Sequence, residues 1–140
     1  MITAIDTNVF IALWDLDHTI SSLARALLRT ALESGGLVVA APVFAELLAC
    51  QGRDEAFLDA FFRDTGITTD WKLDEAVWRA AGRAFQAYAA RRRRHGNSGP
   101  RRILADFVIG AHAIEKAHPL LTLDDRFYRT AFPRLIIVRV

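Results

Sequence analysis

Short, almost uniformly apolar segments alternate along this chain with longer segments whose apolar residues recur at helical spacing. The clearest apolar segments read ITAI at 2–5, LVVA at 37–40 and LIIV at 135–138. They are apolar throughout rather than at every second position, which is typical of strands buried on both faces. Such strands form parallel sheets covered by helices on both sides, so the sequence predicts an α/β fold with a mostly parallel sheet.

The remaining segments complete this alternation. Further short strands are expected at 67–69 and 120–121. Helices are expected at 8–14, 19–33, 42–50, 53–64, 73–93, 103–116 and 125–131. Ser34-Gly35-Gly36 ends the second of these helices, and Pro42 suits the first turn of the third. HGNSGP at 95–100 is expected to be a loop.

A length of 140 residues favours one domain spanning 1–140, which is large enough to bury a core without disulfides. Cys50 is the only cysteine, and no Cys/His cluster has zinc spacing, which fits a reducing compartment. The first residues lack the basic region of a signal peptide, and the longest apolar stretch is too short to span a bilayer. We therefore expect a cytoplasmic protein with no membrane segment.

Charge is distributed unevenly. Residues 76–105 contain eight Arg and no acid, whereas the other residues carry 10 basic and 16 acidic side chains, a net charge of −6. A basic segment on an otherwise acidic body is typical of a protein that binds a polyanion beside a carboxylate-rich site. The run from 91 to 94 is equally consistent with a solvated helix end. The candidate phosphate contacts are Arg91, Arg92, Arg93, Arg94, Arg101 and Arg102.

Four acidic residues stand in apolar surroundings. Asp6 follows ITAI, Asp124 follows LLTL, Glu46 lies within VFAELLAC, and Asp106 lies within ILADFVIGAHAI. Residues just beyond the carboxyl ends of parallel strands meet at one edge of the sheet, which would bring Asp6 and Asp124 together. Glu46 and Asp106 are expected in the first turns of helices that point towards the same edge.

Four neighbouring carboxylates require a cation, because a buried carboxylate is costly and like charges repel. Ligands that are all oxygen select Mg²⁺ or Mn²⁺ over softer metals. Phosphodiester cleavage is the chemistry that needs such a site, since a bound metal ion polarises the phosphoryl oxygen and activates a water molecule.

Each acid also has a purely structural interpretation. Asp6 could cap the helix that follows it, and the two helical acids could lie on solvated faces. Thr122 and Asp125 have the spacing of a capping box, which makes Asp125 the structural member of the pair that it forms with Asp124. The functional interpretation therefore depends on the four acids taken together.

Four segments, in this order, resemble the signatures of PIN-domain nucleases, and within them those of VapC-like toxins from type II toxin–antitoxin pairs. They are IDTNVFIAL, APVFAELLA, RRILADFVIGAHA and LLTLDDRFYRTAFPRLIIV, and they span nearly the whole chain. The resemblance implies a PIN-like three-layer domain with a mostly parallel five-stranded sheet flanked by helices. It also implies an endoribonuclease that uses Mg²⁺ or Mn²⁺, an RNA substrate, a VapB-like antitoxin partner and a homodimer.

By position, the family's catalytic and metal-binding acids correspond to Asp6, Glu46, Asp106 and Asp124. The polar residues that support these acids correspond to Asn8 and Thr122. Two questions stay open: whether Asp124, Asp125 or both reach the metal, and whether the site holds one ion or two.

Other classes of protein fit less well. A phosphatase of the haloacid dehalogenase type needs a second Asp two residues after the first, where this chain has Asn8. A response-regulator receiver needs an adjacent acidic pair after its first strand, and no G-x-G-x-x-G follows that strand to bind a dinucleotide. A PIN scaffold with a degenerate site, which only binds RNA or protein, is the remaining alternative, and the intact acid set argues against it.

Two further kinds of residue are expected to serve packing. His112 lies six residues beyond Asp106, about 600° of helical turn, so it should face away from the acids. Trp14, Trp71 and Trp78 should pack in the core or an interface, because no aromatic cluster accompanies them in the sequence.

Overall fold

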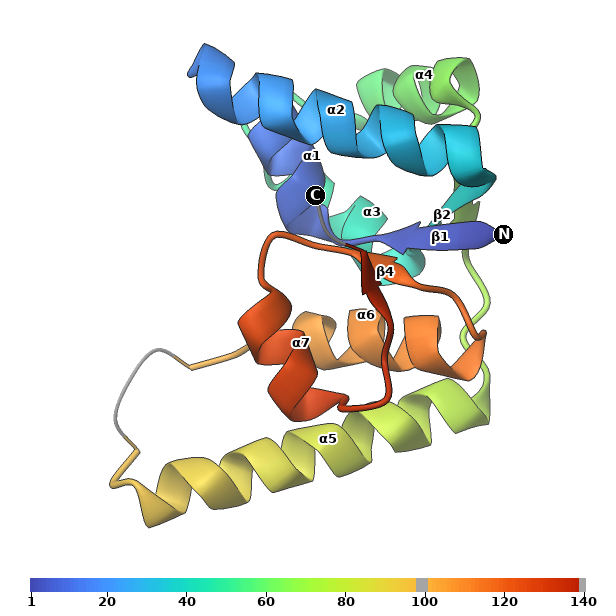
Figure 1. Cartoon of the computed structure of the whole chain (residues 1–140). Helices are drawn as coiled ribbons and strands as arrows, with labels where there is room; N and C mark the ends of the chain where they lie inside the picture. The colour runs from blue at the N-terminus through green and yellow to red at the C-terminus, as the bar shows by residue number, and fades with distance from the viewer. Residues whose placement is uncertain (98–100, 139–140) are drawn as a thin grey trace.

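The computed structural model describes residues 1–97 and 101–138, and a five-stranded sheet forms its centre (Figure 1). The strands are arranged in the order β3-β2-β1-β4-β5, and every neighbouring pair is parallel. The predicted α/β fold is confirmed. The strands are β1 (Ile2–Ile5), β2 (Gly36–Ala40), β3 (Thr68–Asp70), β4 (Leu120–Leu121) and β5 (Ile137–Val138).

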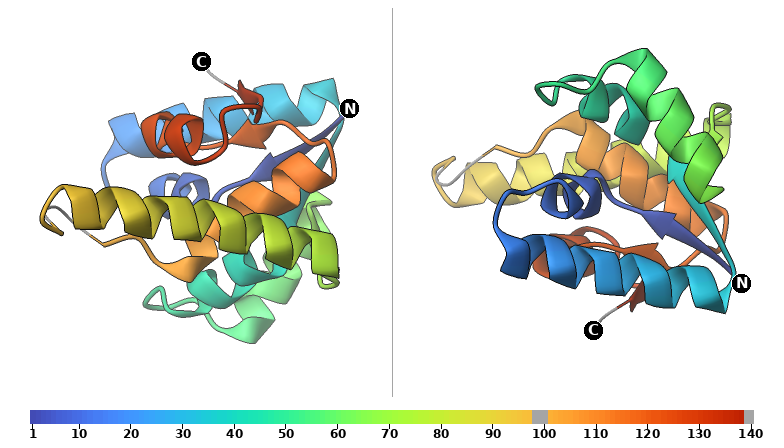
Figure 2. Two further views of the ribbon diagram at one scale, coloured as in Figure 1. Left: turned by 90° about the horizontal axis from the view of Figure 1, so that it is seen from below. Right: turned by 90° about the horizontal axis from the view of Figure 1, so that it is seen from above.

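Helices cover both faces of the sheet and produce three layers. Figures 1 and 2 show α2 on one face and α6 on the other, with α5 packed outside α6. The helices are α1 (Thr7–Leu13), α2 (His18–Ser34), α3 (Ala41–Leu48), α4 (Glu55–Thr65), α5 (Glu75–Arg94), α6 (Leu104–Glu115) and α7 (Asp125–Ala131). The C-terminal end of α5 projects beyond the body of the molecule, on the side to which the strands point (Figure 1).

All of the predicted elements occur, with ends that differ by a few residues. The glycines after α2 act as predicted: Gly35 has φ 150°, and a Cβ at this position would overlap the Met1 carbonyl oxygen. Of the loop predicted at 95–100, residues 98–100 lie outside the described residues. None of the helices in the described part of the chain is both long enough and apolar enough to cross a bilayer.

His112 is fully buried in α6, as predicted, and it links this helix to the edge strand β3. Its Nε2 lies 3.0 Å from the Asp70 Oδ2 at the end of β3. Burial lowers the pKa of His112, although the hydrogen bond to Asp70 acts in the opposite direction. The imidazole is therefore neutral at physiological pH and serves as a buried polar tie between two elements.

The packing predicted for Trp14 is confirmed, through an aromatic cluster that the sequence did not show, whereas Trp71 and Trp78 are exposed. Trp14, at the end of α1, packs edge-on against Phe57 and Phe61 of α4, with ring centroids 5.6 and 5.3 Å apart. The Arg53 guanidinium lies 4.7 Å over the Trp14 ring. The fold assembles this cluster from segments more than forty positions apart in the chain, so local sequence context could not reveal it.

Candidate active site

The first acid follows β1 at the carboxyl edge of the sheet, next to the end of β4. The Asp6 backbone N–H donates to the Leu121 carbonyl at 2.9 Å, and the Thr122 hydroxyl donates to the Asp6 carboxylate at 2.8 Å. Asp6 stands at the N-cap position of α1, but its side chain makes no capping hydrogen bond. Its carboxylate is thus held by a side chain from the neighbouring strand end, and its contacts do not support the capping interpretation.

Thr122 is the centre of the polar contacts around Asp6. Its single hydroxyl proton goes to Asp6, so its oxygen acts as acceptor for the Asn8 amide at 3.4 Å and for the Asp124 backbone N–H at 3.0 Å. The Asn8 side-chain oxygen also accepts from the Leu123 N–H at 3.2 Å. Asn8 and Thr122 therefore fix the loop after β4 against the start of α1.

The predicted capping box is wrong. The N-cap of α7 is Asp124 rather than Thr122, because Thr122 turns inward to Asp6. Asp125 is instead the first residue of α7, and its carboxylate pairs with Arg129 one turn later at 2.9 Å. This ion pair agrees with a structural role for Asp125.

Asp124 is paired with an arginine from the basic segment. The Arg102 Nη1 lies 2.7 Å from the Asp124 Oδ2, and its guanidinium stacks 4.4 Å over the ring of Phe127. The backbone N–H of Arg102 donates to the Tyr88 hydroxyl at 2.7 Å, which connects this residue to α5. Arg102, one of the candidate phosphate contacts, therefore lies beside the acids.

The two helical acids approach from α3 and α6. Asp106 lies in the first turn of α6, as predicted, whereas Glu46 is the sixth residue of α3 and lies in its second turn, not in the first as predicted. The Glu46 carboxylate accepts from the Thr7 hydroxyl at 2.6 Å. Asp106 lies close enough to Asp6, Glu46 and Asp124 to interact electrostatically with all three.

This proximity changes the titration of the two innermost acids. The pKa of Asp6 is raised to about 6, chiefly by burial and also by the charge of Asp106, although hydrogen bonding acts in the opposite direction. Burial also raises the pKa of Asp106, and the charge of Glu46 adds to this effect, whereas Arg102 opposes it. Both carboxyls are therefore destabilised as anions in the absence of a cation.

Tyr128 is a member of the site that the sequence did not reveal. Its buried hydroxyl makes no hydrogen bond of good geometry to a described residue, yet it lies close enough to Asp6 to lower the pKa of that carboxyl. Burial, followed by the charges of Asp6 and Asp106, raises the pKa of Tyr128 far above its usual value, so the phenol stays protonated. Thr7 was missed as well, although it stands between Asp6 and Asn8 in the first signature.

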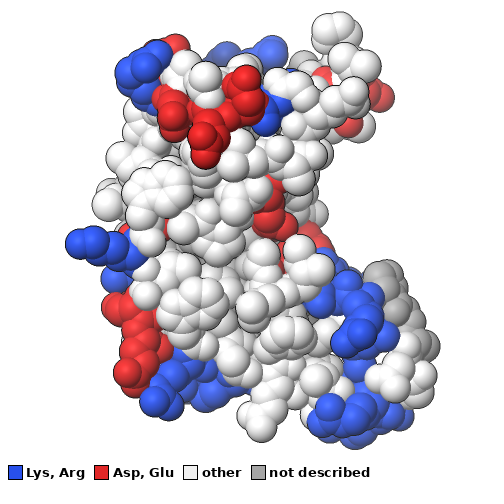
Figure 3. Space-filling view, turned by 180° about the vertical axis from the view of Figure 1, so that it is seen from behind, with Lys and Arg blue, Asp and Glu red and all other residues white. Residues whose placement is uncertain are grey.

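An acidic region and a basic region adjoin at one side of the molecule. Figure 3 shows acidic side chains in a hollow at one side, with a dense group of basic side chains next to it. Residues 91–94 form the last turn of α5, where cations also suit the helix dipole. An extended anion that crosses the hollow would therefore meet positive charge on leaving it.

The donor set suits a hard divalent cation, but the side chains are not gathered around one point. Within residues 1–97 and 101–138, no three His, Cys, Asp or Glu side chains are close enough to hold a metal ion together. Glu46 is held by Thr7, and Asp124 by Arg102. The four acids nevertheless suit such a cation chemically, because every donor is a carboxylate oxygen. Burial and negative neighbours also raise the pKa values of Asp6 and Asp106, which a bound cation would offset.

A parallel α/β domain with acids beyond its strand ends defines a fold class that suits metal-assisted phosphate chemistry. Residues 3–133 match the family model of the PIN domain, so the chain belongs to the PIN-domain family. Members of this family are generally nucleases that use divalent metal ions. The predicted family and its PIN-like fold are confirmed.

Solved structures share this fold. VapBC2 from Rickettsia felis, bound to a DNA fragment from the promoter, is similar with a TM-score of 0.69 and 18% identity, over 99% of this chain and 98% of that chain. VapBC-1 from nontypeable Haemophilus influenzae has a TM-score of 0.67 and 19% identity, over 99% and 97%. FitAcB from Neisseria gonorrhoeae has a TM-score of 0.63 and 19% identity, over 99% and 97%. No curated protein matches the chain in sequence.

Proposed function

We propose that this protein is an endoribonuclease dependent on Mg²⁺ or Mn²⁺ and acts as the toxin of a toxin–antitoxin pair. The observation that carries the proposal is the buried Asp6, whose pKa is raised to about 6 and which faces further acids at the carboxyl edge of the sheet. Burial and negative neighbours make the charged form of Asp6 unfavourable. A cation bound by this carboxylate would explain why the fold keeps an acid at that position.

In this proposal the metal is held by Asp6, Glu46, Asp106 and Asp124. When bound, the ion would polarise the phosphoryl oxygen as a Lewis acid and lower the pKa of a water molecule that attacks the phosphorus atom. Thr122 keeps Asp6 oriented, and Asn8 braces Thr122. Arg102 neutralises Asp124 and presents a guanidinium that is suited to a substrate phosphate.

The test is cleavage of RNA by the purified protein, with and without a chelator. We expect cleavage in Mg²⁺ or Mn²⁺, loss of cleavage when the metal is removed, and recovery when it is added back. Cleavage that persists in chelator would exclude a metal-dependent mechanism.

A second candidate function is a non-catalytic PIN scaffold that binds RNA or protein. The observation that favours it is that no three acids are gathered tightly among the described residues. Titration with Mn²⁺ separates the two candidates. Saturable binding that is lost in Asp106→Asn supports the nuclease, whereas no binding supports the scaffold.

The basic end of α5 is expected to contact the RNA backbone. Arg93 and Arg94 are both exposed there, so replacing both with Ser should weaken RNA binding without changing metal binding. For single-stranded RNA, the slope of log K against log salt should fall by roughly 0.7 for each phosphate that the variant no longer binds. The matched control is the double replacement of Arg25 and Arg29 on α2, which removes the same charge. Equal slopes in the two variants would make the run a solvated helix end.

We further propose a VapB-like antitoxin partner and a homodimer. The similar structures named above include VapBC assemblies, and this chain exposes large apolar side chains such as Leu16, Trp71 and Ile136. A partner segment that carries an Arg could enter the acidic hollow and pair with its carboxylates.

Expression of the protein alone should therefore slow growth of the host, whereas co-expression with the adjacent reading frame should restore it. The purified protein should sediment as a dimer at micromolar concentration. Unaffected growth would contradict the toxin assignment, and a monomer would contradict the homodimer, while the nuclease assignment would depend on the cleavage assay alone.

A further inference from the structure

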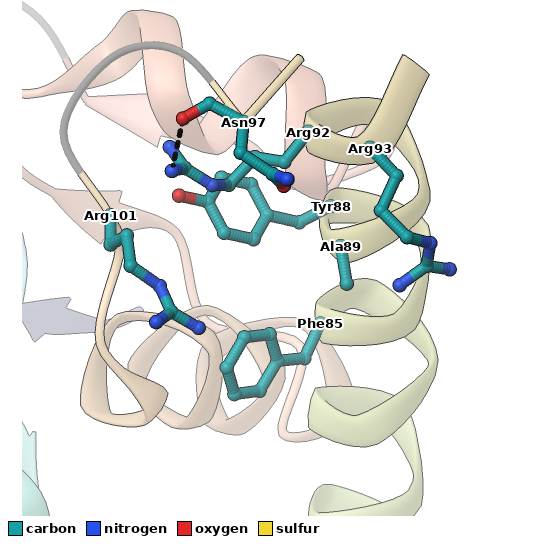
Figure 4. A pocket seen from close by; sticks show the side chains of 7 residues that line it. All are labelled: Phe85, Tyr88, Ala89, Arg92, Arg93, Asn97 and Arg101. Carbon is teal, nitrogen blue, oxygen red and sulfur yellow. Dashed lines mark hydrogen bonds between the residues drawn. The ribbon is translucent and has the colours of Figure 1, made fainter. Parts of the chain in front are cut away.

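We propose that the pocket between the end of α5 and the segment that leads into α6 binds one unpaired nucleotide of an RNA, with the base stacked on Phe85 and the phosphates held by Arg93 and Arg101 (Figure 4). This proposal rests on the proposed function, whose substrate it narrows to single-stranded RNA.

The pocket has the size and lining of a small-ligand site. Its volume is about 420 Å³, within the range of pockets that enclose small molecules. It combines aromatic rings with cationic side chains, and no acid is among its described lining residues. The lining residues are Phe85, Tyr88, Ala89, Arg92, Arg93, Asn97 and Arg101.

The aromatic floor is supported from behind. The Phe85 ring stacks on Phe107, with centroids 4.7 Å apart and planes 9° apart, and Tyr88 packs on the same ring at 5.3 Å. Phe107 is completely buried, so it holds both rings in place. The small side chain of Ala89 leaves room beside them. A half-buried, fixed ring offers a surface on which any base can stack.

The cations stand at the rim. Figure 4 shows Arg101 and Arg93 on opposite sides of Phe85, with Arg92 near Asn97. Arg92 donates to the Asn97 carbonyl at 2.8 Å, which orders this side of the pocket. Both Arg93 and Arg101 are exposed, and neither forms an ion pair with a described residue. Two such guanidinium groups beside a flat apolar surface match a nucleotide, which carries both an anion and a ring.

The pocket is joined to the acidic site. Tyr88 lines the pocket, and its hydroxyl accepts the backbone N–H of Arg102, whose side chain pairs with Asp124. A chain of RNA with one phosphate at the acids could thus place a neighbouring nucleotide in the pocket. The base must be unpaired, since bases within a duplex have both faces covered by their neighbours.

The test measures binding of a short unpaired RNA to the Asp6→Asn protein, so that cleavage plays no part. Phe85→Leu should weaken binding roughly 5- to 100-fold, the range expected for loss of one base–aromatic stack. The matched control is Trp78→Leu, which removes an exposed aromatic ring from the same helix outside the pocket and should leave affinity unchanged.

A second arm replaces single nucleotides of the RNA with abasic ones, which keep the phosphate but lose the base. At one position, the abasic RNA should bind the protein that retains Phe85 as weakly as the intact RNA binds Phe85→Leu. The same abasic RNA should bind Phe85→Leu no more weakly than the intact RNA does. Because Phe85→Leu could disturb packing on Phe107, Arg101→Gln provides a variant that leaves the floor intact. It should reduce the salt dependence of binding.

Equal affinities of the Phe85→Leu and Trp78→Leu proteins would overturn the proposal, as would equal losses at every abasic position. Loss of binding to a protein partner in Phe85→Leu, with RNA binding unchanged, would assign the pocket to that partner and would also overturn it. Absence of RNA cleavage by the wild-type protein would instead contradict the proposed function, because the binding measurements do not depend on cleavage.

Discussion

Replacing Asp6 or Asp106 with Asn is expected to reduce RNA cleavage more than about 100-fold while the protein stays folded. Loss of a residue that only supports a metal ligand typically costs 10- to 100-fold, so loss of a ligand itself should cost more. The amide keeps the shape of each side chain, and in Asp6→Asn the amide oxygen could still accept the Thr122 hydroxyl proton. Cleavage of a labelled RNA at saturating Mn²⁺ gives the activity, and circular dichroism gives the fold.

The adjacent acids after β4 provide the matched control. Asp124 interacts electrostatically with Asp106, whereas Asp125 pairs with Arg129 on its own helix. Asp124→Asn should therefore lose activity and Asp125→Asn should keep it. Wild-type cleavage by Asp6→Asn or Asp106→Asn would remove that acid from the mechanism, and inactivity of Asp125→Asn alone would transfer the metal ligand from Asp124 to its neighbour.

Much of the fold could be predicted because its strands are buried on both faces. Segments such as 37–40 have no polar face, which leaves few alternatives to a parallel sheet between helices. Helix ends were less certain, because they depend on local capping. α3 begins at Ala41, one residue before the predicted start, and holds Glu46 in its second turn rather than its first; the inward rotation of Thr122 removed the expected capping box.

The order of strands and helices predicted that the four acids lie at one edge of the sheet. It did not predict the residues that pair with these acids. The ion pair between Arg102 and Asp124 joins residues 22 positions apart, and the hydrogen bond between Thr122 and Asp6 joins residues 116 positions apart. Tyr128 lies beside Asp6 through the packing of α7, and no local pattern marks it. Contacts of this kind arise from tertiary structure, which residue spacing along the chain does not encode.

Asp6 is also expected to make the metal-free protein less stable at neutral pH than in mild acid. Burial raises the pKa of this carboxyl to about 6 in the folded protein, from 3.8 as its ordinary value. Between these two values the folded state keeps a proton that the unfolded state has lost, so the free energy of unfolding falls as pH rises. The difference between the two pKa values corresponds to about 3 kcal/mol in the free energy of unfolding. This contribution to stability is fully lost above pH 6.

Asp6→Asn removes this penalty, so the metal-free variant should be more stable than the wild type by up to about 3 kcal/mol at pH 7.5, with the difference disappearing near pH 4. Urea unfolding of both proteins in chelator, across this pH range, measures the difference directly. His112 acts in the opposite sense, because burial lowers its pKa and stability is lost as pH falls below its ordinary value of 6.5. Since His112 is present in both proteins, its contribution cancels in the comparison.

A bound cation should reverse the order of stability. Mg²⁺ or Mn²⁺ at neutral pH stabilises only the state that binds it, so it should raise the midpoint of unfolding of the wild type and leave that of Asp6→Asn nearly unchanged. The Asp6 carboxylate both destabilises the metal-free protein and binds the metal in this proposal. The Asn replacement should therefore remove both the loss of stability at neutral pH and the stabilisation by the metal. An Asn variant that is less stable than the wild type at pH 7.5 in chelator would contradict the burial of a charged Asp6. An equal response of both proteins to the metal would show that the ion binds elsewhere.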